Sequence, residues 1–411
     1  MMKILLLRFN TLKIRRNAVA PFNLDFFSYI FKKNKIQCIL KDMFLKDINN
    51  VNLSNFTHII IESYSYNINK LYKFINKNNF NKQTLISTGN FKPNHTIFKH
   101  HISAFDEKNL KKIFNIKKQI NYFKDFTPSI SHSSHYSFLY PMPFLKKVNW
   151  KYTVSGIGCP GKCKFCSGNI RKGPRSPIKN RNIKKIIYEL KALKKKGFNY
   201  IVFDDDNFFR DKKFAINLIN SIIKNNLNIK WNTHARADSL DEELIILLKK
   251  SGCCFLRIGA ESGSQKILTQ SGKGKNYLKH IFKTANILKK HKIPFIFLTM
   301  LGFPGETIKD LWKTFFMIVK TRPFLIQLHN FVPYEDSYYG KKLGINHNLF
   351  HYSSFKKTFS KYPWWIRDFY HILFYLLFGF IKFLNFDFLK IIFFYFININ
   401  HFKRLFFGNR V

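Results

Sequence analysis

The sequence has few acidic residues. It carries 23 Asp and Glu against 70 Lys and Arg in 411 residues, a formal net charge of +47. Such a balance is typical of proteins that bind nucleic acid or an anionic membrane surface. The lysines are spread over almost every segment, however, and a block of charge, rather than a total, marks a binding tail. Lys, Asn, Ile and Phe are abundant together, which indicates compositional bias, and we expect no nucleic-acid partner.

The sequence also lacks a long apolar run. Its longest uncharged stretch near the carboxyl end, Phe369–Ile381, is shorter than the roughly 18–20 residues that span a bilayer. The chain opens MMKILLLRFN and then turns basic without a cleavage site, so we expect no secretory signal. With 46% hydrophobic and 18% aromatic residues, the chain is able to bury a sizeable core, and its length predicts two or three domains.

Cysteine is scarce, and half of it lies in one segment. The six residues are Cys38, Cys159, Cys163, Cys166, Cys253 and Cys254. A three-cysteine cluster in a large chain indicates a reducing cytosol rather than a disulfide framework. We therefore expect a cytoplasmic protein, with the cysteines outside the cluster as core thiols.

The segment VSGIGCPGKCKFCSG places the three thiols at spacings of four and three residues. Thiolates are soft ligands that select zinc, copper(I) or iron–sulfur clusters. A structural zinc site usually takes four protein ligands, whereas a cluster held by three cysteines leaves one iron open. A zinc knuckle and a chance grouping remain alternatives at this point.

This C-x3-C-x2-C spacing, with an aromatic residue before the last cysteine, resembles the signature of the radical S-adenosylmethionine (SAM) family. The resemblance implies a 4Fe–4S cluster on Cys159, Cys163 and Cys166, whose open iron binds SAM and cleaves it reductively to a 5′-deoxyadenosyl radical. It also implies an electron donor such as flavodoxin or ferredoxin. Phe165 is then expected to pack on the adenine of SAM.

The region 149–333 alternates strands and helices six times. The expected strands are 151–158, 199–205, 229–235, 253–261, 294–301 and 324–332, with helices between them. This count matches the partial (βα)6 TIM-type barrel of the family, and active sites of parallel barrels lie at the carboxyl ends of the strands.

Polar residues follow the second and third of these strands. Asp204 or Asp205 is expected to line the site, because the family has an acidic patch there that accepts a hydrogen bond from the SAM amine. Arg236 resembles the family's R-x-D/E segment and suits a carboxylate. Asp238 and Ser239 are expected to cap a helix. For the acidic cluster, the alternative is a turn at the strand end, with Asp211 capping the next helix.

The later strands end in further family-like motifs. IGAESGS resembles the fourth-strand motif, which implies that Glu261 accepts hydrogen bonds from the ribose and that Ser262 and the Gly263 backbone approach the SAM carboxylate. LGFPGET resembles the motif after the fifth strand, which implies that Gly302 and Gly305 let the backbone approach adenine.

Residues 1–120 also alternate strands and helices, which predicts a doubly wound, Rossmann-like parallel sheet. The stretch APFNLDFFSYIFKKNKIQCILKD resembles the opening of the cobalamin-binding-type domain found ahead of many radical SAM modules. The Asp-x-His-x-x-Gly motif is absent, and Thr88-Gly89-Asn90 replaces the expected Gly-Gly. Cobalamin is therefore a candidate cofactor only. Residues 121–148 are expected to form a linker.

Residues 334–411 are densely aromatic and are expected to form a helical region. Trp364-Trp365 with flanking cations fits helices lying in a membrane interface through 363–407, and a helical cap on the barrel fits equally well. An interfacial position would place the protein at the inner face of a membrane and make a lipid substrate natural.

The sequence thus predicts a radical SAM enzyme of α/β fold that methylates or cyclises a small-molecule or lipid substrate. One alternative is an enzyme like the transfer RNA methylthiotransferases. That group has a second three-cysteine cluster in its N-terminal domain, whereas Cys38 is alone here. The other alternative is a basic zinc protein that binds nucleic acid and has no catalytic activity.

Overall fold

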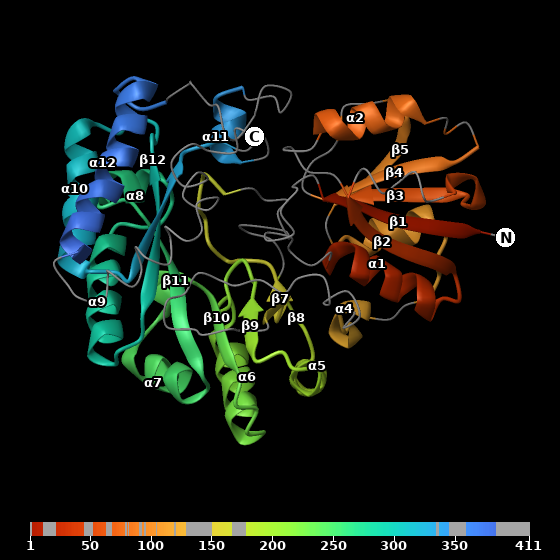
Figure 1. Cartoon of the computed structure of the whole chain (residues 1–411), viewed down its shortest axis with the longest axis horizontal. Coiled ribbons are helices and arrows are strands. Elements are labelled where there is room, and N and C mark those ends of the chain that lie inside the picture. The colour runs from red at the N-terminus through yellow and green to blue at the C-terminus, as the bar shows by residue number, and fades with distance from the viewer. Residues whose placement is uncertain are drawn as a thin grey trace.

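The computed structural model has two α/β parts, which lie side by side in Figure 1. It describes residues 2–10, 22–44, 52–62, 68–78, 80, 82–89, 93, 96–103, 105–118, 121–128, 150–166, 178–333, 337–344 and 359–383. The first part is a five-stranded sheet and the second a six-stranded sheet, and every strand pair within the two sheets is parallel. The α/β fold class expected from the sequence is confirmed.

The first sheet has the strand order β2-β1-β3-β4-β5. Its strands are β1 (Lys3–Asn10), β2 (Gln37–Phe44), β3 (His58–Glu62), β4 (Thr84–Gly89) and β5 (Phe98–Ser103). The helices are α1 (Phe22–Lys33), α2 (Ile68–Lys77), α3 (Glu107–Ile113) and the short α4 (Tyr122–Asp125).

Alternate side chains of β1 enter two different cores. Ile4 and Leu6 pack with α1, α3 and α4, whereas Leu5 and Leu7 pack with α2 on the opposite face. A strand buried on both faces reads as a continuous apolar run, which is why KILLLR predicts it well. The helices on both faces make this the doubly wound sheet that the sequence predicts.

The start of the expected linker belongs to this first core. Tyr122, Phe123 and Phe126 are fully or almost fully buried there, and the rest of the linker from residue 129 to 148 lies outside the described residues. Phe126 also joins the two parts of the chain, because its carbonyl accepts a hydrogen bond of 3.1 Å from Arg181 Nε. Arg181 pairs in turn with the buried Glu189 at 2.6 Å.

The second sheet has the order β13-β12-β11-β10-β9-β6. Its strands are β6 (Trp150–Thr153), β9 (Tyr200–Phe203), β10 (Lys230–Ala235), β11 (Cys253–Glu261), β12 (Phe295–Leu301) and β13 (Leu325–Asn330). A small antiparallel pair, β7 (Gly156–Ile157) and β8 (Lys179–Asn180), flanks the first strand. The six expected strands are confirmed.

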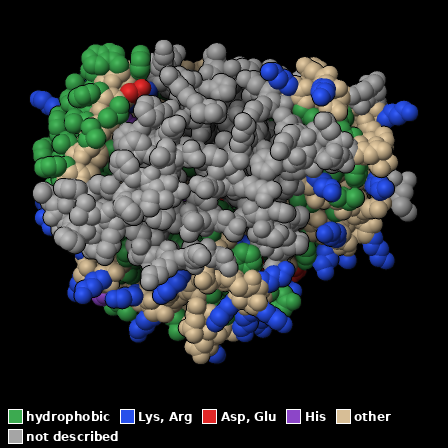
Figure 2. All heavy atoms as spheres, in the orientation of Figure 1, with side chains coloured by type: hydrophobic (Ala, Val, Ile, Leu, Met, Phe, Trp, Pro, Cys, Tyr) green, Lys and Arg blue, Asp and Glu red, His purple; other side chains and the backbone are tan. Residues whose placement is uncertain are grey.

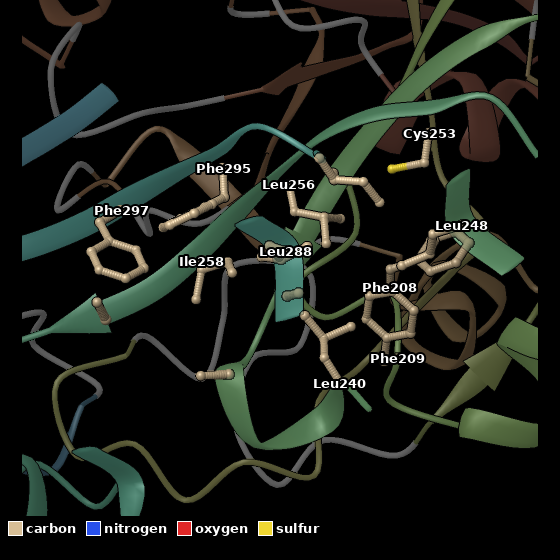
Figure 3. Packing of buried hydrophobic residues seen from close by; sticks show 14 of the residues in the cluster. Phe208, Phe209, Leu240, Leu248, Cys253, Leu256, Ile258, Leu288, Phe295 and Phe297 are labelled. Carbon is tan, nitrogen blue, oxygen red and sulfur yellow. The ribbon is translucent and has the colours of Figure 1, made fainter. Parts of the chain in front are cut away.

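Helices cover this sheet on its outer side. They are α5 (Ile183–Lys195), α6 (Lys212–Lys224), α7 (Glu242–Lys250), α8 (Gln265–Gln270), α9 (Tyr277–Lys290) and α10 (Ile308–Thr321). Figure 3 shows the core between them, where Leu256, Ile258 and Cys253 of β11 lie among apolar side chains. Cys253 is thus a core thiol, as expected. Asp211 caps α6, as predicted, whereas α7 is capped by Asp241 and not by Asp238 or Ser239.

The carboxyl-terminal region is helical where it is described, in α11 (Tyr338–Lys342) and α12 (Trp364–Phe383). α12 packs on α10: the rings of Phe374 and Phe315 are 5.2 Å apart. The amide of Leu328 on the edge strand β13 donates a hydrogen bond of 3.1 Å to the Tyr375 hydroxyl. α12 therefore caps the barrel, and residues 384–411 lie outside the described part of the chain. None of the described helices combines the length and the apolarity that a bilayer crossing requires.

Candidate functional site

The three cysteines lie in a loop that follows β6 and β7 at the carboxyl edge of the second sheet. Gly161 sits between their sulfurs: a Cβ at this position would lie 3.2 Å from Cys159 Sγ and 3.8 Å from Cys163 Sγ. The Gly161 amide donates to Cys159 Sγ at 3.4 Å. The glycine therefore keeps the space between the Cys159 and Cys163 sulfurs free of a side chain.

Two neighbouring segments hold the cysteine loop. The amide of Lys164 donates to the Ser271 carbonyl at 2.8 Å, and Gly272 approaches so closely that a Cβ would be 2.3 Å from the Lys162 carbonyl oxygen. From the other side, the amide of Tyr339 donates to the Lys164 carbonyl at 3.2 Å. The loop is thus positioned by the turn after α8 and by α11, which lie far apart in the sequence.

Arg236 brings a positive charge to the thiols. Its Nη1 donates to Cys163 Sγ at 3.3 Å, and its Nε and Nη2 bind the Asp238 carboxylate at 2.9 and 2.7 Å. Burial would lower the pKa of Arg236, but the Asp238 hydrogen bonds, Tyr277 and Cys163 raise it above its ordinary value. The guanidinium is therefore a fixed cation beside Cys163, and the predicted R-x-D segment is a single ion pair.

The two outer thiols, of Cys159 and Cys166, are partly buried in the structure. Burial is the main cause that raises the pKa of Cys159 and of Cys166 above the ordinary value for a thiol, and Cys163 raises both further. Arg236 acts in the opposite direction on Cys159, and Lys273 does so on Cys166. A site of three thiolates would be stabilised by these two cations, because each offsets negative charge gathered in a buried place.

Glu261 ends β11 in an unusual backbone conformation. Its φ is 65°, in the left-handed region that costs a residue with a side chain about 1–3 kcal/mol, and a bulge shifts the strand register between Gly259 and Glu261. The carboxylate pairs with the buried Lys273 Nζ at 2.9 Å. A Cβ on Gly259 would lie 2.6 Å from Glu261 Oε1, so the glycine makes room for this carboxylate.

Lys273 connects Glu261 to the rest of the site. Its Nζ donates to the Gly259 carbonyl at 3.1 Å and lies 5.9 Å from the Phe165 ring centroid. Burial alone would lower the pKa of Lys273, but Glu261, Tyr277 and Cys163 raise it above its ordinary value. The side chain therefore remains a buried cation between the fourth-strand motif and the cysteine loop.

The acidic cluster after β9 divides into different roles. Asp205 is fully engaged beneath the loop: it pairs with Arg210 at 2.6 Å and accepts hydrogen bonds from the Ser155 hydroxyl and the Gly156 amide at 2.7 and 3.0 Å. The Asp204 amide donates to the Thr153 carbonyl at 2.8 Å, which joins β9 to β6. The structure therefore turns the predicted Asp205 toward the scaffold rather than toward the thiols.

Asp206, the third acid of the cluster, influences the thiols through its charge. Its carboxylate contributes, after burial, to the raised pKa values of Cys159 and Cys166. The pattern Asp-Asp-Asp-Asn alone does not distinguish the three aspartates, because the chain turns sharply at the strand end.

Ser262 and Gly263, in the loop after β11, are held by α10. Both are tied to Thr314 of α10: the Gly263 amide donates to its Oγ1 at 2.9 Å, and the Ser262 hydroxyl lies 3.2 Å from the same atom. A Cβ on Gly263 would approach the Lys313 carbonyl oxygen to 2.2 Å. In this arrangement these groups bind α10, and their expected contact with a SAM carboxylate stays a prediction.

The glycines after β12 form a turn that the carboxyl-terminal region holds. Gly302 (φ 93°) and Gly305 (φ 75°) both adopt left-handed backbone. The Gly302 amide donates to Glu306 Oε2 at 2.6 Å and to the Tyr362 hydroxyl at 3.1 Å. The Tyr362 hydroxyl also donates to Glu306, and the Gly305 amide donates to the Phe359 carbonyl at 3.3 Å. The segment before α12 is thereby part of the turn.

Phe165 joins the two motifs in one apolar cluster. Its ring lies 5.8 Å from that of Phe303, within a group that also contains Ile267, Phe331 and Tyr339. Phe165 thus packs between the cysteine loop and the turn after β12. Its packing on adenine stays a prediction.

Sequence reasoning did not single out Lys273 as a charged member of the site, Asp206 as the acid whose charge raises the pKa of two thiols, or Tyr362. The Lys-Gly pair after IGAESGS was the available signal for Lys273. Tyr362 has no local signal, since it reaches the turn from 56 residues away along the chain. Within the described ranges, no three His, Cys, Asp or Glu side chains are close enough to hold one metal ion.

The fold and the site define a class: a partial parallel β/α barrel that carries a three-thiol loop at the carboxyl edge of its strands, behind a doubly wound domain. Residues 153–318 match the sequence profile of the Radical SAM superfamily. The match covers most of the barrel, 166 of the 411 residues, and thus marks a radical SAM domain in this part of the chain.

Two curated proteins are similar to part of this chain. An uncharacterised methyltransferase from Pyrococcus horikoshii is 33% identical over 176 residues, 40% of this chain and 37% of that protein. The bacteriochlorophyllide d C-12(1)-methyltransferase of Chlorobaculum tepidum is 30% identical over 193 residues, 46% of this chain and 41% of the relative. The matched regions thus span less than half of the length of these relatives.

Among solved structures, the radical SAM methyltransferase TsrM from Kitasatospora setae, with cobalamin and a 4Fe–4S cluster bound, has a TM-score of 0.63 and 12% identity. The similarity covers 83% of this chain and 78% of that one. At this identity the similarity shows the fold. It extends over both parts of the chain, so the order of a doubly wound domain before a radical SAM barrel is shared.

Proposed function

We propose that this chain is a radical SAM enzyme that methylates or cyclises a small-molecule or lipid substrate. The observation that carries the proposal is the three-thiol loop at the carboxyl edge of a radical SAM domain. The names of the relatives, two of them methyltransferases, support the methylation branch. A cyclase acting on magnesium-protoporphyrin monomethyl ester, from Rubrivivax gelatinosus, supports the cyclisation branch.

The residues of the loop fit a 4Fe–4S cluster. The loop carries three soft donors, two of which, Cys159 and Cys163, flank the position that a Cβ at Gly161 would fill, and Arg236 and Lys273 supply positive charge. Cys159, Cys163 and Cys166 would hold the cluster. When bound, the cluster supplies the electron that cleaves SAM to a 5′-deoxyadenosyl radical.

The protein's own groups would bind and orient SAM. Glu261 is aimed by its left-handed backbone and by the Lys273 ion pair, which suits an acceptor for ribose hydroxyls. The charge of Asp206 raises the pKa of Cys159 and Cys166, and Asp206 replaces Asp205 as our candidate acceptor for the SAM amine. Arg236 is our candidate partner of the carboxylate.

The proposal also covers a second cofactor, a redox partner and the location of the enzyme. Methyl transfer would use cobalamin in the N-terminal domain, and cyclisation would leave that domain as a scaffold. A small reductase partner such as flavodoxin or ferredoxin would supply the electron. We place the enzyme in the cytoplasm, with peripheral contact at the inner face of a membrane.

The alternative of a transfer RNA methylthiotransferase has a specific observation in its favour, because such enzymes are also among the similar proteins. That group, however, carries a second three-cysteine cluster in its N-terminal domain. Residues 1–148, ahead of the barrel, hold Cys38 alone, so we keep the alternative second.

The test is one anaerobic assay of SAM cleavage. The chain, reconstituted with iron and sulfide, is given dithionite and SAM, with and without cobalamin, and 5′-deoxyadenosine and S-adenosylhomocysteine are quantified. We expect 5′-deoxyadenosine in the wild type and none with Glu261→Gln at low SAM concentration. Both products, only with cobalamin, would identify a methylase; neither product from a cluster-loaded chain would contradict the proposal.

A further inference from the structure

One face of α12 is apolar and exposed along its whole described length. Its exposed positions are Trp365, Phe369, Ile372, Leu376 and Phe380. Their spacing of four, three, four and four residues places them on one side of the helix. Each is between 47% and 64% exposed, so this face, which we call the α12 stripe, is not part of the barrel core.

The opposite face of the same helix is fixed to the barrel. Phe374 is fully buried and Phe378 nearly so, and Trp312 of α10 lies 5.6 Å from the Tyr370 ring. Trp312 also contacts Phe316, a neighbouring side chain of α10 that is 62% exposed. Figure 2 shows the resulting gathering of apolar side chains over α10 and α12. A helix held on one side in this way is able to lie on a membrane but not to cross it.

The charges beside the stripe are positive. Lys309, Lys313 and Lys320 share the exposed side of α10 with Phe316, and Lys361 is exposed just before α12. The acid on α12, Asp368, is neutralised by Arg367 Nη2 at 2.8 Å. An apolar face with Trp and Phe, bordered by lysines, is the pattern of a helix in the plane of an anionic membrane.

We propose that the α12 stripe is the surface by which this chain binds an anionic lipid bilayer. Aromatic side chains enter the headgroup region while the lysines meet lipid phosphates. The net charge of +47 attracts the whole molecule to the same surface. This inference deepens the proposed membrane contact and is independent of the SAM chemistry, because the binding needs no cluster.

The contact also reaches the site. The segment that leads into α12 donates and accepts hydrogen bonds with the turn after β12: the Lys361 amide donates to the Glu306 carbonyl at 2.9 Å, and Tyr362 binds Gly302 and Glu306. A membrane bound at the stripe therefore lies against the element that holds this turn, which favours a substrate delivered from the bilayer.

The test is flotation of the full chain with vesicles. Vesicles of phosphatidylcholine with phosphatidylglycerol are compared with phosphatidylcholine alone, at low and high salt. The stripe variant is Phe369→Ser with Phe380→Ser, and the control is Tyr188→Ser, which changes an equally exposed aromatic residue on α5. We expect the wild type and the control to float with anionic vesicles, less so at high salt, and the stripe variant to bind about tenfold more weakly.

Other occupants of the stripe give different results. A wild type that is dimeric in solution, fails to float, and becomes monomeric with the stripe changes would show that a second copy covers this face. A monomeric wild type that fails to float would show that the face is not a membrane surface. Equal binding of the stripe variant and the wild type would place the membrane contact elsewhere, and each of these results overturns the proposal.

Discussion

At the scale of single residues, the buried carboxyl group of Glu306 helps to hold the turn after β12. Glu306 is fully buried in the turn after β12, where Oε2 accepts hydrogen bonds from the Gly302 amide and Tyr362. Its Oε1 has no hydrogen-bond partner among the described residues. Burial raises the pKa of Glu306 to about 7, against the lowering effect of these two hydrogen bonds. The turn therefore contains a carboxyl group that titrates near neutral pH.

This titration predicts a pH-dependent stability. Because the folded pKa lies above the unfolded one, the folded chain binds more protons between about pH 4.5 and 7, and the stability contributed by Glu306 falls as the pH rises through this range. Between pH 5 and 8 we expect the free energy of unfolding of the wild type to fall by about 2–3 kcal/mol relative to Glu306→Gln.

Denaturant unfolding of the apoprotein at both pH values measures this difference. The control is Glu243→Gln, which changes an exposed glutamate at the start of α7. A wild type and Glu306→Gln variant whose stabilities change in parallel from pH 5 to 8 would rule out a neutral, buried Glu306.

At the scale of elements, the site depends on how closely α10 approaches the loop after β11. Gly263 lies against the backbone of α10, and Thr314 binds both Ser262 and Gly263. The start of α10 is fixed as well, by the capping box of Thr307 and Asp310, and Asp310 also accepts a hydrogen bond of 2.7 Å from Ser264. The helix and the loop are thus one packed unit.

The substitution Gly263→Ala is expected to separate α10 from the loop after β11. The added Cβ would meet the Lys313 carbonyl oxygen at 2.2 Å, and neither backbone segment is free to move away without breaking the bonds to Thr314. We expect a loss of about 1–3 kcal/mol in unfolding free energy, measured by urea denaturation. Gly344→Asn, at an open left-handed position with nothing within 4 Å, is the control and should stay within about 0.5 kcal/mol. Equal stability of the two variants would contradict the close packing.

At the scale of the whole molecule, the sequence predicts the elements better than their contacts. The six strands of the barrel are confirmed because each is a short apolar run followed by a helical pattern, and the motifs that the sequence places at their carboxyl ends do meet at one edge. The three-cysteine loop is recognisable for the same reason, since its spacing is local.

What the sequence does not predict is set by long-range packing. Asp204, Asp205 and Asp206 are equivalent as letters, and only the position of Arg210 and Ser155 shows that Asp205 belongs to the scaffold. The burial of Tyr122 in the first core and the packing of α12 on α10 also depend on surfaces that are distant in the sequence. For α12, the sequence fits a barrel cap and an interfacial helix equally well. The buried face of the helix suits the cap, and the exposed face suits the interface.

The most direct test of the account is the iron and sulfide content of the chain after anaerobic reconstitution. We predict four irons and four sulfides per chain for the wild type and for Cys38→Ala, with the absorbance of a 4Fe–4S cluster, since Cys38 lies in the first core away from the loop. Cys163→Ala, which removes the sulfur that Arg236 contacts, should lose most of this iron. Retention of the full cluster by Cys163→Ala, or zinc without iron in the wild type, would contradict the account.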